Sequence, residues 1–150
     1  MTSLIERINS LSDDKKALLA NKLAPASFGQ QRLWFINQLQ PESTAYHLFT
    51  SVSFTGDFCI DSFQKAITTV VNRHDNLRTS FLLFDNSIRQ LVHPKTDFPM
   101  GFANLSDCDE IERKRCLDDI AHKQCSQVFD LESGPLIRVM VIRTAADEHV

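Results

Sequence analysis

The run of residues 61–84 constrains the fold of this chain more than any other stretch. Asp61 is a candidate N-cap and Gln64 follows it at capping-box spacing, which predicts the start of a helix. Residues at steps of three and four then form one stripe, the pattern of a buried helix face. The stripe consists of Phe63, Ala66, Ile67, Val70, Val71 and His74. A short apolar run over 80–84 predicts a strand, so the pattern indicates a helix that leads directly into a strand.

Two arginines and a histidine lie at the junction between this helix and this strand. Arg73 and Arg78 carry permanent charges, and a buried arginine needs a carboxylate or several acceptors. His74 falls on the apolar stripe. Because buried polar groups are usually satisfied within the protein, we interpret His74 as a hydrogen-bonded core histidine rather than a catalytic base.

The rest of the chain alternates helices with strands. Helices are predicted over 30–39, where Trp34 and Phe35 are core candidates, and over 106–127, with Ser106 or Asp107 as the cap. Strict alternation predicts a strand over 46–55. Further strands are predicted over 88–92, after a turn at 85–87, and over 136–143, whose nearly continuous apolar character indicates burial on both faces. This alternation predicts an α/β layer architecture.

Composition excludes several function classes. The chain is 43% hydrophobic and 23% charged, as is ordinary for a folded globular domain. A net charge of −3 argues against a phosphate-backbone binder, so no nucleic-acid partner is expected. The first residues lack the basic and then apolar organisation of a signal peptide, and no apolar run approaches the roughly 18 residues of a membrane span. We expect a cytoplasmic protein without a membrane partner.

The cysteines do not suggest a metal centre or a disulfide framework. Cys59, Cys108, Cys116 and Cys125 are scattered without a CxxC pair, so free thiols are expected. His122 lies three residues before Cys125, but two candidate ligands fall short of the usual four of a zinc site. No metal site is predicted.

Three stretches resemble the signature motifs of nonribosomal peptide synthetase condensation domains. Residues 73–81, RHDNLRTSF, resemble the second motif, RHExLRTxF, with Asp75 in place of the glutamate. Residues 27–35, SFGQQRLWF, resemble the first motif, SxAQxRLWxL, and Gly29 departs from its alanine. The positions that match are Ser27, Gln30, Arg32, Leu33 and Trp34. Residues 129–138 resemble the stretch FDLxxGPLxR through Phe129, Asp130, Leu131, Gly134, Pro135, Leu136 and Arg138. The three matches follow the order of the family.

The resemblance implies an incomplete version of a known fold. It implies a two-layer or three-layer α/β sandwich, the N-terminal lobe of the chloramphenicol-acetyltransferase-like fold, incomplete at its C-terminal edge. Residues 25–150 would supply most of this lobe, and the last strand, 136–143, is expected to leave an exposed sheet edge. Residues 1–24 form a separate helical segment with two open interpretations, a linker packed on the main domain or a docking element for an upstream part of the synthetase.

The resemblance also implies a function. Condensation domains are acyltransferases that form amide bonds between an acyl or peptidyl donor and an aminoacyl acceptor. Both are tethered to phosphopantetheine arms of upstream and downstream peptidyl carrier domains, and an adenylation domain adjoins them in the parent synthetase. No directly bound cofactor is implied. The alternative is a non-catalytic docking or interaction module built on the same lobe. The segment 41–46 resembles domains that accept an L-configured donor.

The residues to which the family assigns catalysis are not among these 150. The family's third motif, HHxxxDG, does not occur here, and His149 lacks both the adjacent histidine and the following Asp-Gly. We therefore predict no catalytic residue in this chain and no activity of the chain alone. The resemblance implies that Arg73 pairs with the aspartate of that later motif, and that Arg78 and His74 support the site structurally. It assigns a structural role to the first motif as well.

Overall fold

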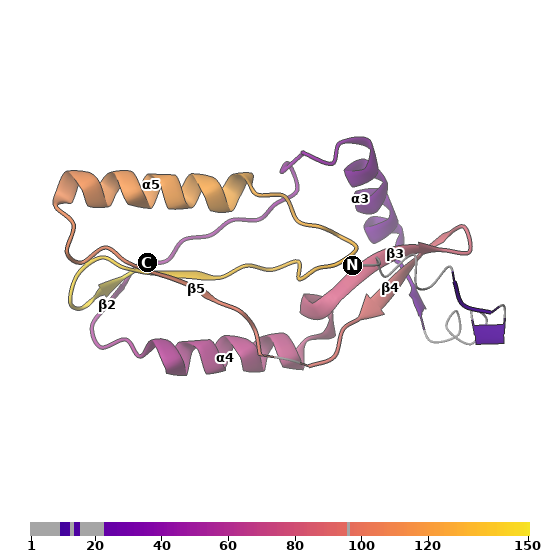
Figure 1. Ribbon diagram of the computed structural model, residues 1–150, viewed down its shortest axis with the longest axis horizontal. Coiled ribbons are helices and arrows are strands. Elements are labelled where there is room, and N and C mark those ends of the chain that lie inside the picture. Colours follow the sequence, from indigo (N-terminus) through magenta and orange to yellow (C-terminus); the bar gives the residue numbers. More distant parts are fainter. Residues whose placement is uncertain (1–9, 13, 16–22, 96) are drawn as a thin grey trace.

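The computed structural model describes residues 10–12, 14–15, 23–95 and 97–150 (Figure 1). Within these residues, one sheet has the strand order β1-β4-β3, with β1 at Ala24–Pro25, β3 at Thr79–Phe84 and β4 at Ser87–Val92. Both of its ladders are antiparallel. Its buried cluster is formed by Leu23, Leu82 and Phe84. The predicted helical segment 1–24 lies largely outside the described residues.

A second sheet combines parallel and antiparallel strands in the order β2-β7-β6-β5. Its strands are β2 at Phe54–Thr55, β5 at Gly101–Asn104, β6 at Met140–Arg143 and β7 at Glu148–His149. β5 runs parallel to β6, while β7 pairs antiparallel with both β2 and β6. Helices α4, Ile60–Arg73, and α5, Glu110–Ser126, lie on opposite sides of this sheet (Figure 1). The predicted α/β layer architecture is confirmed.

The predicted passage from helix to strand is also confirmed, with a different start. α4 ends at Arg73, a 3₁₀ turn spans Asp75–Arg78, and β3 follows at once. The helix begins after Cys59, whose side chain makes no capping hydrogen bond, so the capping box predicted at Asp61 is wrong. Asp61 lies inside the first turn instead, where the helix dipole favours its carboxylate.

The hairpin of β3 and β4 turns on two residues with positive φ. Asp85 has φ 49° and Asn86 has φ 55°, while Phe84 pairs with Ser87. Two consecutive left-handed residues make a type I′ turn, whose twist matches that of the strands that it joins. Asp and Asn tolerate this conformation because their side chains bond locally, so the predicted turn is confirmed, with Ser87 already in the strand.

Replacing Asn86 by valine should destabilise the protein, because a β-branched side chain opposes positive φ. We expect Asn86→Val to lower the free energy of unfolding by about 1–2 kcal/mol. Asn86→Gly is the matched control and should leave stability unchanged or raise it slightly, since glycine is the preferred second residue of this turn. Urea melts measure both. Equal stability of the two variants would contradict the assigned turn.

Two predicted strands form only at one end. Within 46–55 only β2 is paired, and within 136–143 only β6 is. β2 pairs with β7, and β6 pairs with β5 and β7. The edge expected beside the last strand is nevertheless wrong, because β7 pairs with β6. The edge strands of this sheet are β2 and β5.

The remaining helices differ slightly from their predicted bounds. α3 covers Phe28–Leu39 and begins two residues earlier than predicted. α5 begins at Glu110, because Asp109 is the residue that caps it, with its carboxylate accepting from the N–H of Glu112 at 2.8 Å. The predicted caps, Ser106 and Asp107, lie in the preceding turn. No helix in the described part of the chain is long and apolar enough to cross a bilayer.

Candidate functional site

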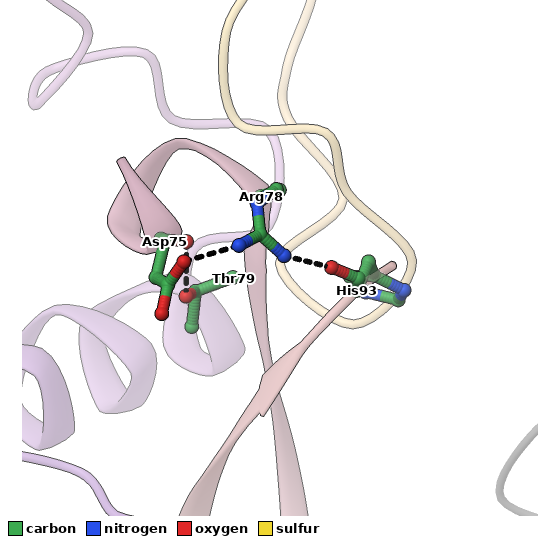
Figure 2. Close-up of polar contacts among 4 residues, drawn as sticks. All are labelled: Asp75, Arg78, Thr79 and His93. Atoms are coloured by element: carbon green, nitrogen blue, oxygen red, sulfur yellow. Dashed lines mark hydrogen bonds and ion pairs between the residues drawn. The ribbon is translucent and has the colours of Figure 1, made fainter. Parts of the chain in front are cut away.

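The second motif builds a compact polar network at the start of β3 (Figure 2). The guanidinium of Arg78 pairs with the carboxylate of Asp75 and donates to the backbone oxygen of His93. The Thr79 hydroxyl donates to the backbone oxygen of Asp75 at 2.7 Å. The side chain of Arg78 is 14% exposed, and its Nε is buried with no hydrogen-bond partner among the described residues. Arg78 therefore holds the 3₁₀ turn against the end of β4.

His93 completes this network from the β4 side. Its backbone N–H donates to the oxygen of Arg78 at 2.9 Å, and its Nε2 lies 2.8 Å from the hydroxyl of Ser80, which is fully buried. In the sequence, His93 marks only the end of a strand. Nothing in the pattern indicates its role, because the contact joins residues that become neighbours only through the hairpin register.

The first two residues of the motif face solvent. Arg73 is exposed and makes no ion pair or hydrogen bond through its side chain within the described residues. His74 is exposed as well, so its interpretation as a core histidine is wrong. The helix ends at Arg73, and His74 takes an extended backbone as the C-cap, which turns it away from the apolar stripe. Its backbone N–H still caps the helix on the oxygen of Val70 at 3.1 Å.

The first motif closes and anchors the start of α3. Ser27 and Gln30 form a reciprocal capping box, a signal that their spacing could have revealed in the sequence. The amide of Gln30 also donates to Gln90 on β4 at 3.2 Å. Gln90 in turn donates to the backbone oxygen of Pro25 at 2.9 Å. The motif residues thus join α3 to the β1-β4-β3 sheet.

The other side chains of α3 are more exposed than predicted. Phe35 is 59% exposed, so its assignment to the core is wrong. Trp34 is half-buried, and its indole N–H has no hydrogen-bond partner in the described part of the chain. Arg32 is exposed, and Leu33 lines a groove that it shares with Phe129.

The third match folds into a loop organised by Asp130. Its carboxylate accepts from the hydroxyl of Ser133 at 2.5 Å and from the backbone N–H of Glu132 at 2.9 Å. The Ser133 hydroxyl, and then the backbone N–H groups, hold the pKa of Asp130 below its usual value. Gly134 occupies φ 60°, a conformation that glycine adopts without strain. The loop is tied to β3 by the N–H of Phe81, which donates to the oxygen of Leu131 at 2.7 Å.

Removing the Ser133 hydroxyl should raise the pKa of Asp130. A depressed folded pKa contributes stability above the unfolded pKa and loses it as the pH falls through the folded pKa, so this contribution disappears in acid. We expect Ser133→Ala to move the titration of Asp130 towards that of an ordinary aspartate. An NMR titration of the Asp130 carboxyl carbon measures the shift, with Ser126→Ala as the control. An unchanged midpoint would show that the hydroxyl does not cause the depression.

Arg138, the last residue of the third match, closes the C-terminal end of α5. Its guanidinium lies 3.9 Å from the ring centre of Phe129 and donates to the backbone oxygens of Gln124, Gln127 and Val128. Carbonyls at this end of a helix lack intrahelical partners and carry partial negative charge, so a cation is stabilising there. Burial lowers the pKa of Arg138 from its usual value, and the group remains charged.

A groove lies between the first and third matches. Its volume is about 360 Å³, and α3, the segment 43–48 and the loop after α5 form its walls. His47 packs edge-on against Phe129 with ring centres 5.0 Å apart. The lining is Leu33, Ile36, Asn37, Gln40, Ser43, Tyr46, His47, Leu48, Phe129, Leu131, Leu136, Ile137 and Arg138.

The described part of the chain holds no group of three or more candidate metal ligands, and its four cysteines are free. The hydrogen bond that the Ser62 hydroxyl donates to the sulfur of the exposed Cys59 lowers the pKa of that thiol. The geometry brings the motif residues into anchoring contacts, while Arg73 is left as an exposed cation.

Comparison with known proteins places these motifs in one family. The family model described as "Condensation domain" matches residues 20–150. The chain is 34% identical over 130 residues to the chondramide synthase cmdD of Chondromyces crocatus, an alignment that covers 84% of this chain and 3% of the relative. It is 32% identical over 124 residues to bacitracin synthase 3 of Bacillus licheniformis, covering 83% of this chain and 2% of the relative. The chain therefore spans a small part of the curated relatives that it matches.

Solved structures agree on the fold. The starter condensation domain of the rhizomide synthetase RzmA aligns with a TM-score of 0.82 at 20% identity, over 92% of this chain and 31% of that chain. The first condensation domain of the CDA synthetase aligns with a TM-score of 0.70 at 15% identity, over 85% of this chain and 33% of that chain.

Proposed function

This chain belongs to the condensation-domain family, and we propose that it forms the opening part of a nonribosomal peptide synthetase condensation domain. The observation that carries the proposal is the family match over residues 20–150. Relatives named as synthases of chondramide and bacitracin support it. Residues 25–150 would form part of the first lobe, and residues 1–24 would link or dock it.

The proposed reaction of the complete domain is amide-bond formation. The amine of an aminoacyl thioester on one carrier domain attacks the thioester carbonyl of the donor on another, and the donor's phosphopantetheine thiol leaves. Holding two tethered reactants in line removes much of the entropic barrier. A base that takes the amine proton and donors that stabilise the oxyanion supply the rest. We assign those groups to residues outside these 150.

The contribution of this chain would be to position the site. The guanidinium of Arg78 binds the carboxylate of Asp75 and the backbone oxygen of His93, so it holds in place the turn that follows Arg73. Arg73 is exposed and, within the described residues, its side chain has no partner. A planar guanidinium can pair with a carboxylate through two parallel hydrogen bonds, which fixes the orientation of that carboxylate. We therefore propose that Arg73 anchors a carboxylate of the catalytic loop.

Product formation tests the proposed function. The complete domain should transfer a donor from one loaded carrier domain to the aminoacyl group on another, and mass spectrometry of the acceptor carrier reports the added mass. The 150 residues alone should give no product above background, since they lack the histidine motif. An inactive complete domain with correctly loaded carriers would contradict the proposed function. Clear product from the 150 residues alone would contradict the assignment of catalysis to other residues.

A further inference from the structure

A second cavity lies at one end of the mixed sheet, where the turn between β6 and β7 meets the start of α4. Figure 1 shows this yellow turn and the first residues of α4 at the same end of the molecule. The cavity has a volume of about 250 Å³, and its walls come from the segment 56–60, from β5 and from the hairpin of β6 and β7. It shares no lining residue with the groove described above, so the two are separate.

The register of this hairpin brings Arg143 and His149 together on one face of the sheet. The two residues are paired across β6 and β7. The next pair along, Ile142 and Val150, exchanges two backbone hydrogen bonds, at 2.7 and 2.8 Å. Arg143 and His149 therefore form a non-hydrogen-bonded pair, the kind in which opposite side chains lie closest. Both side chains line the cavity.

Arg143 has one edge of its guanidinium free for a ligand. Its Nε donates to the backbone oxygen of Ala145 at 3.2 Å, and its Nη2 donates to that of Ala146 at 3.0 Å. These bonds use one edge of the group and tie it to the turn. The edge with Nη1 has no acceptor in the described part of the chain, and no carboxylate there lies within ion-pair distance. A free guanidinium edge can hold an oxyanion through two parallel hydrogen bonds.

His149 is a buried polar side chain that the chain itself does not satisfy. It is 7% exposed, and its ring packs on that of Phe58 with centres 4.7 Å apart. Its Nδ1 is buried with no hydrogen-bond partner among the described residues. A buried polar atom without a partner lowers stability, so a ligand is one way to satisfy it. An imidazole always carries at least one N–H donor, which suits an anion in the cavity beside it.

The start of α4 adds a third source of positive potential. The helix begins at Ile60, which lines the cavity, and its N-cap residue, Cys59, makes no side-chain capping hydrogen bond. The first N–H groups of a helix lack intrahelical partners and form the positive end of its dipole. Phosphate groups commonly bind at this end of a helix. Asp61 of the first turn is not among the residues that line the cavity.

We propose that this cavity binds a phosphate group, which Arg143 and His149 hold through hydrogen bonds at the start of α4. The group is free phosphate or the end of a phosphate monoester, since both present the same oxygens. Phosphate suits the cavity better than a carboxylate, because its oxygens can reach donors on more than one side. Asp57, an exposed residue, is the one carboxylate among the described lining residues, and its repulsion should reduce the affinity.

This inference goes beyond the proposed function and does not rest on it, because the cavity contains no residue of the three motif matches.

An NMR titration of the 150-residue chain with inorganic phosphate at neutral pH tests this, with sodium chloride at equal ionic strength as the reference. Phosphate should move the amide signals of Gly56 and Ile60 and the side-chain signals of Arg143 and His149 along one saturable curve. Signals of α5 should not move. Tighter binding of methyl phosphate means that the site takes an ester, and equal or weaker binding means that it takes free phosphate. Shifts equal to those in chloride, or equal binding of acetate, overturn the proposal.

Two substitutions separate this site from other basic surfaces. Arg143→Lys keeps the charge without the bidentate fork and should weaken phosphate binding at least tenfold. Asp57→Asn removes the repulsion and should strengthen binding about threefold. Its matched control is Asp118→Asn, an exposed change on α5 that should have no effect.

Asp57 is exposed and lies outside the helices and strands, so this second variant tests the site even where Arg143→Lys does not fold. Unchanged binding by folded Arg143→Lys overturns the proposal. Equal affinity of Asp57→Asn and Asp118→Asn for phosphate overturns it as well.

Discussion

Replacing Arg73 by alanine in the complete condensation domain should lower the free energy of unfolding by about 3–5 kcal/mol. That is the cost of breaking a buried pair, because the carboxylate proposed to face Arg73 would be left buried and uncompensated. In the 150-residue chain the guanidinium is exposed without a partner among the described residues. There the same substitution should cost less than about 1 kcal/mol, as for an exposed charge.

Denaturant melts of both proteins, with and without Arg73→Ala, measure this difference. Arg115→Ala is the control, since Arg115 is an exposed arginine on α5 and should matter little in either protein. An equal loss in the two proteins would mean that Arg73 is held by a partner inside residues 1–150. The role that we assign to it would then be wrong.

Replacing Arg138 by methionine should destabilise the 150-residue chain itself, by about 2–3 kcal/mol. The guanidinium holds the backbone oxygens of Gln124, Gln127 and Val128 and stacks on Phe129, and hydrogen bonds to a charged group are the stronger kind. Methionine keeps most of the apolar stem, so the loss isolates the charged head.

The matched control for this variant is Arg115→Met, which should stay within about 0.5 kcal/mol of the unmodified chain. Urea melts compare the two, and amide exchange over 124–128 locates the effect. The end of α5 should open first in Arg138→Met. If Arg138→Met loses no more stability than Arg115→Met, water replaces the guanidinium at these carbonyls without a loss of free energy. The role that we assign to Arg138 would then be wrong.

The sequence predicted the elements whose signals are local. The helix of α4 followed from the three-and-four spacing of its apolar stripe, and the hairpin turn from Asp85 and Asn86, which accept positive φ. The bounds of the strands were predicted less accurately, because pairing depends on a neighbouring strand that is distant in the sequence. The alternation over 46–55 predicted one continuous strand, yet only Phe54–Thr55 is paired, and its partner is β7.

The motif residues were located from the sequence, but their contacts were not. Gln30 meets Gln90 across 60 positions, and Arg138 reaches back to carbonyls of α5. Such contacts depend on how separate elements pack, which periodicity does not encode. His74 shows the limit most clearly: it continues the apolar stripe in sequence, while the helix ends one residue before it and leaves it exposed.

The most direct test of the supporting role of this chain is a single-turnover rate of amide formation in the complete domain with Arg73 varied. The rate is measured with preloaded carrier domains at a temperature where every variant is folded. Arg73→Ala should slow amide formation by at least tenfold, Arg73→Lys should recover part of the rate by restoring a charge without the bidentate fork, and Arg115→Ala should not change it. An unchanged rate in folded Arg73→Ala would contradict the proposal that this chain positions the catalytic loop.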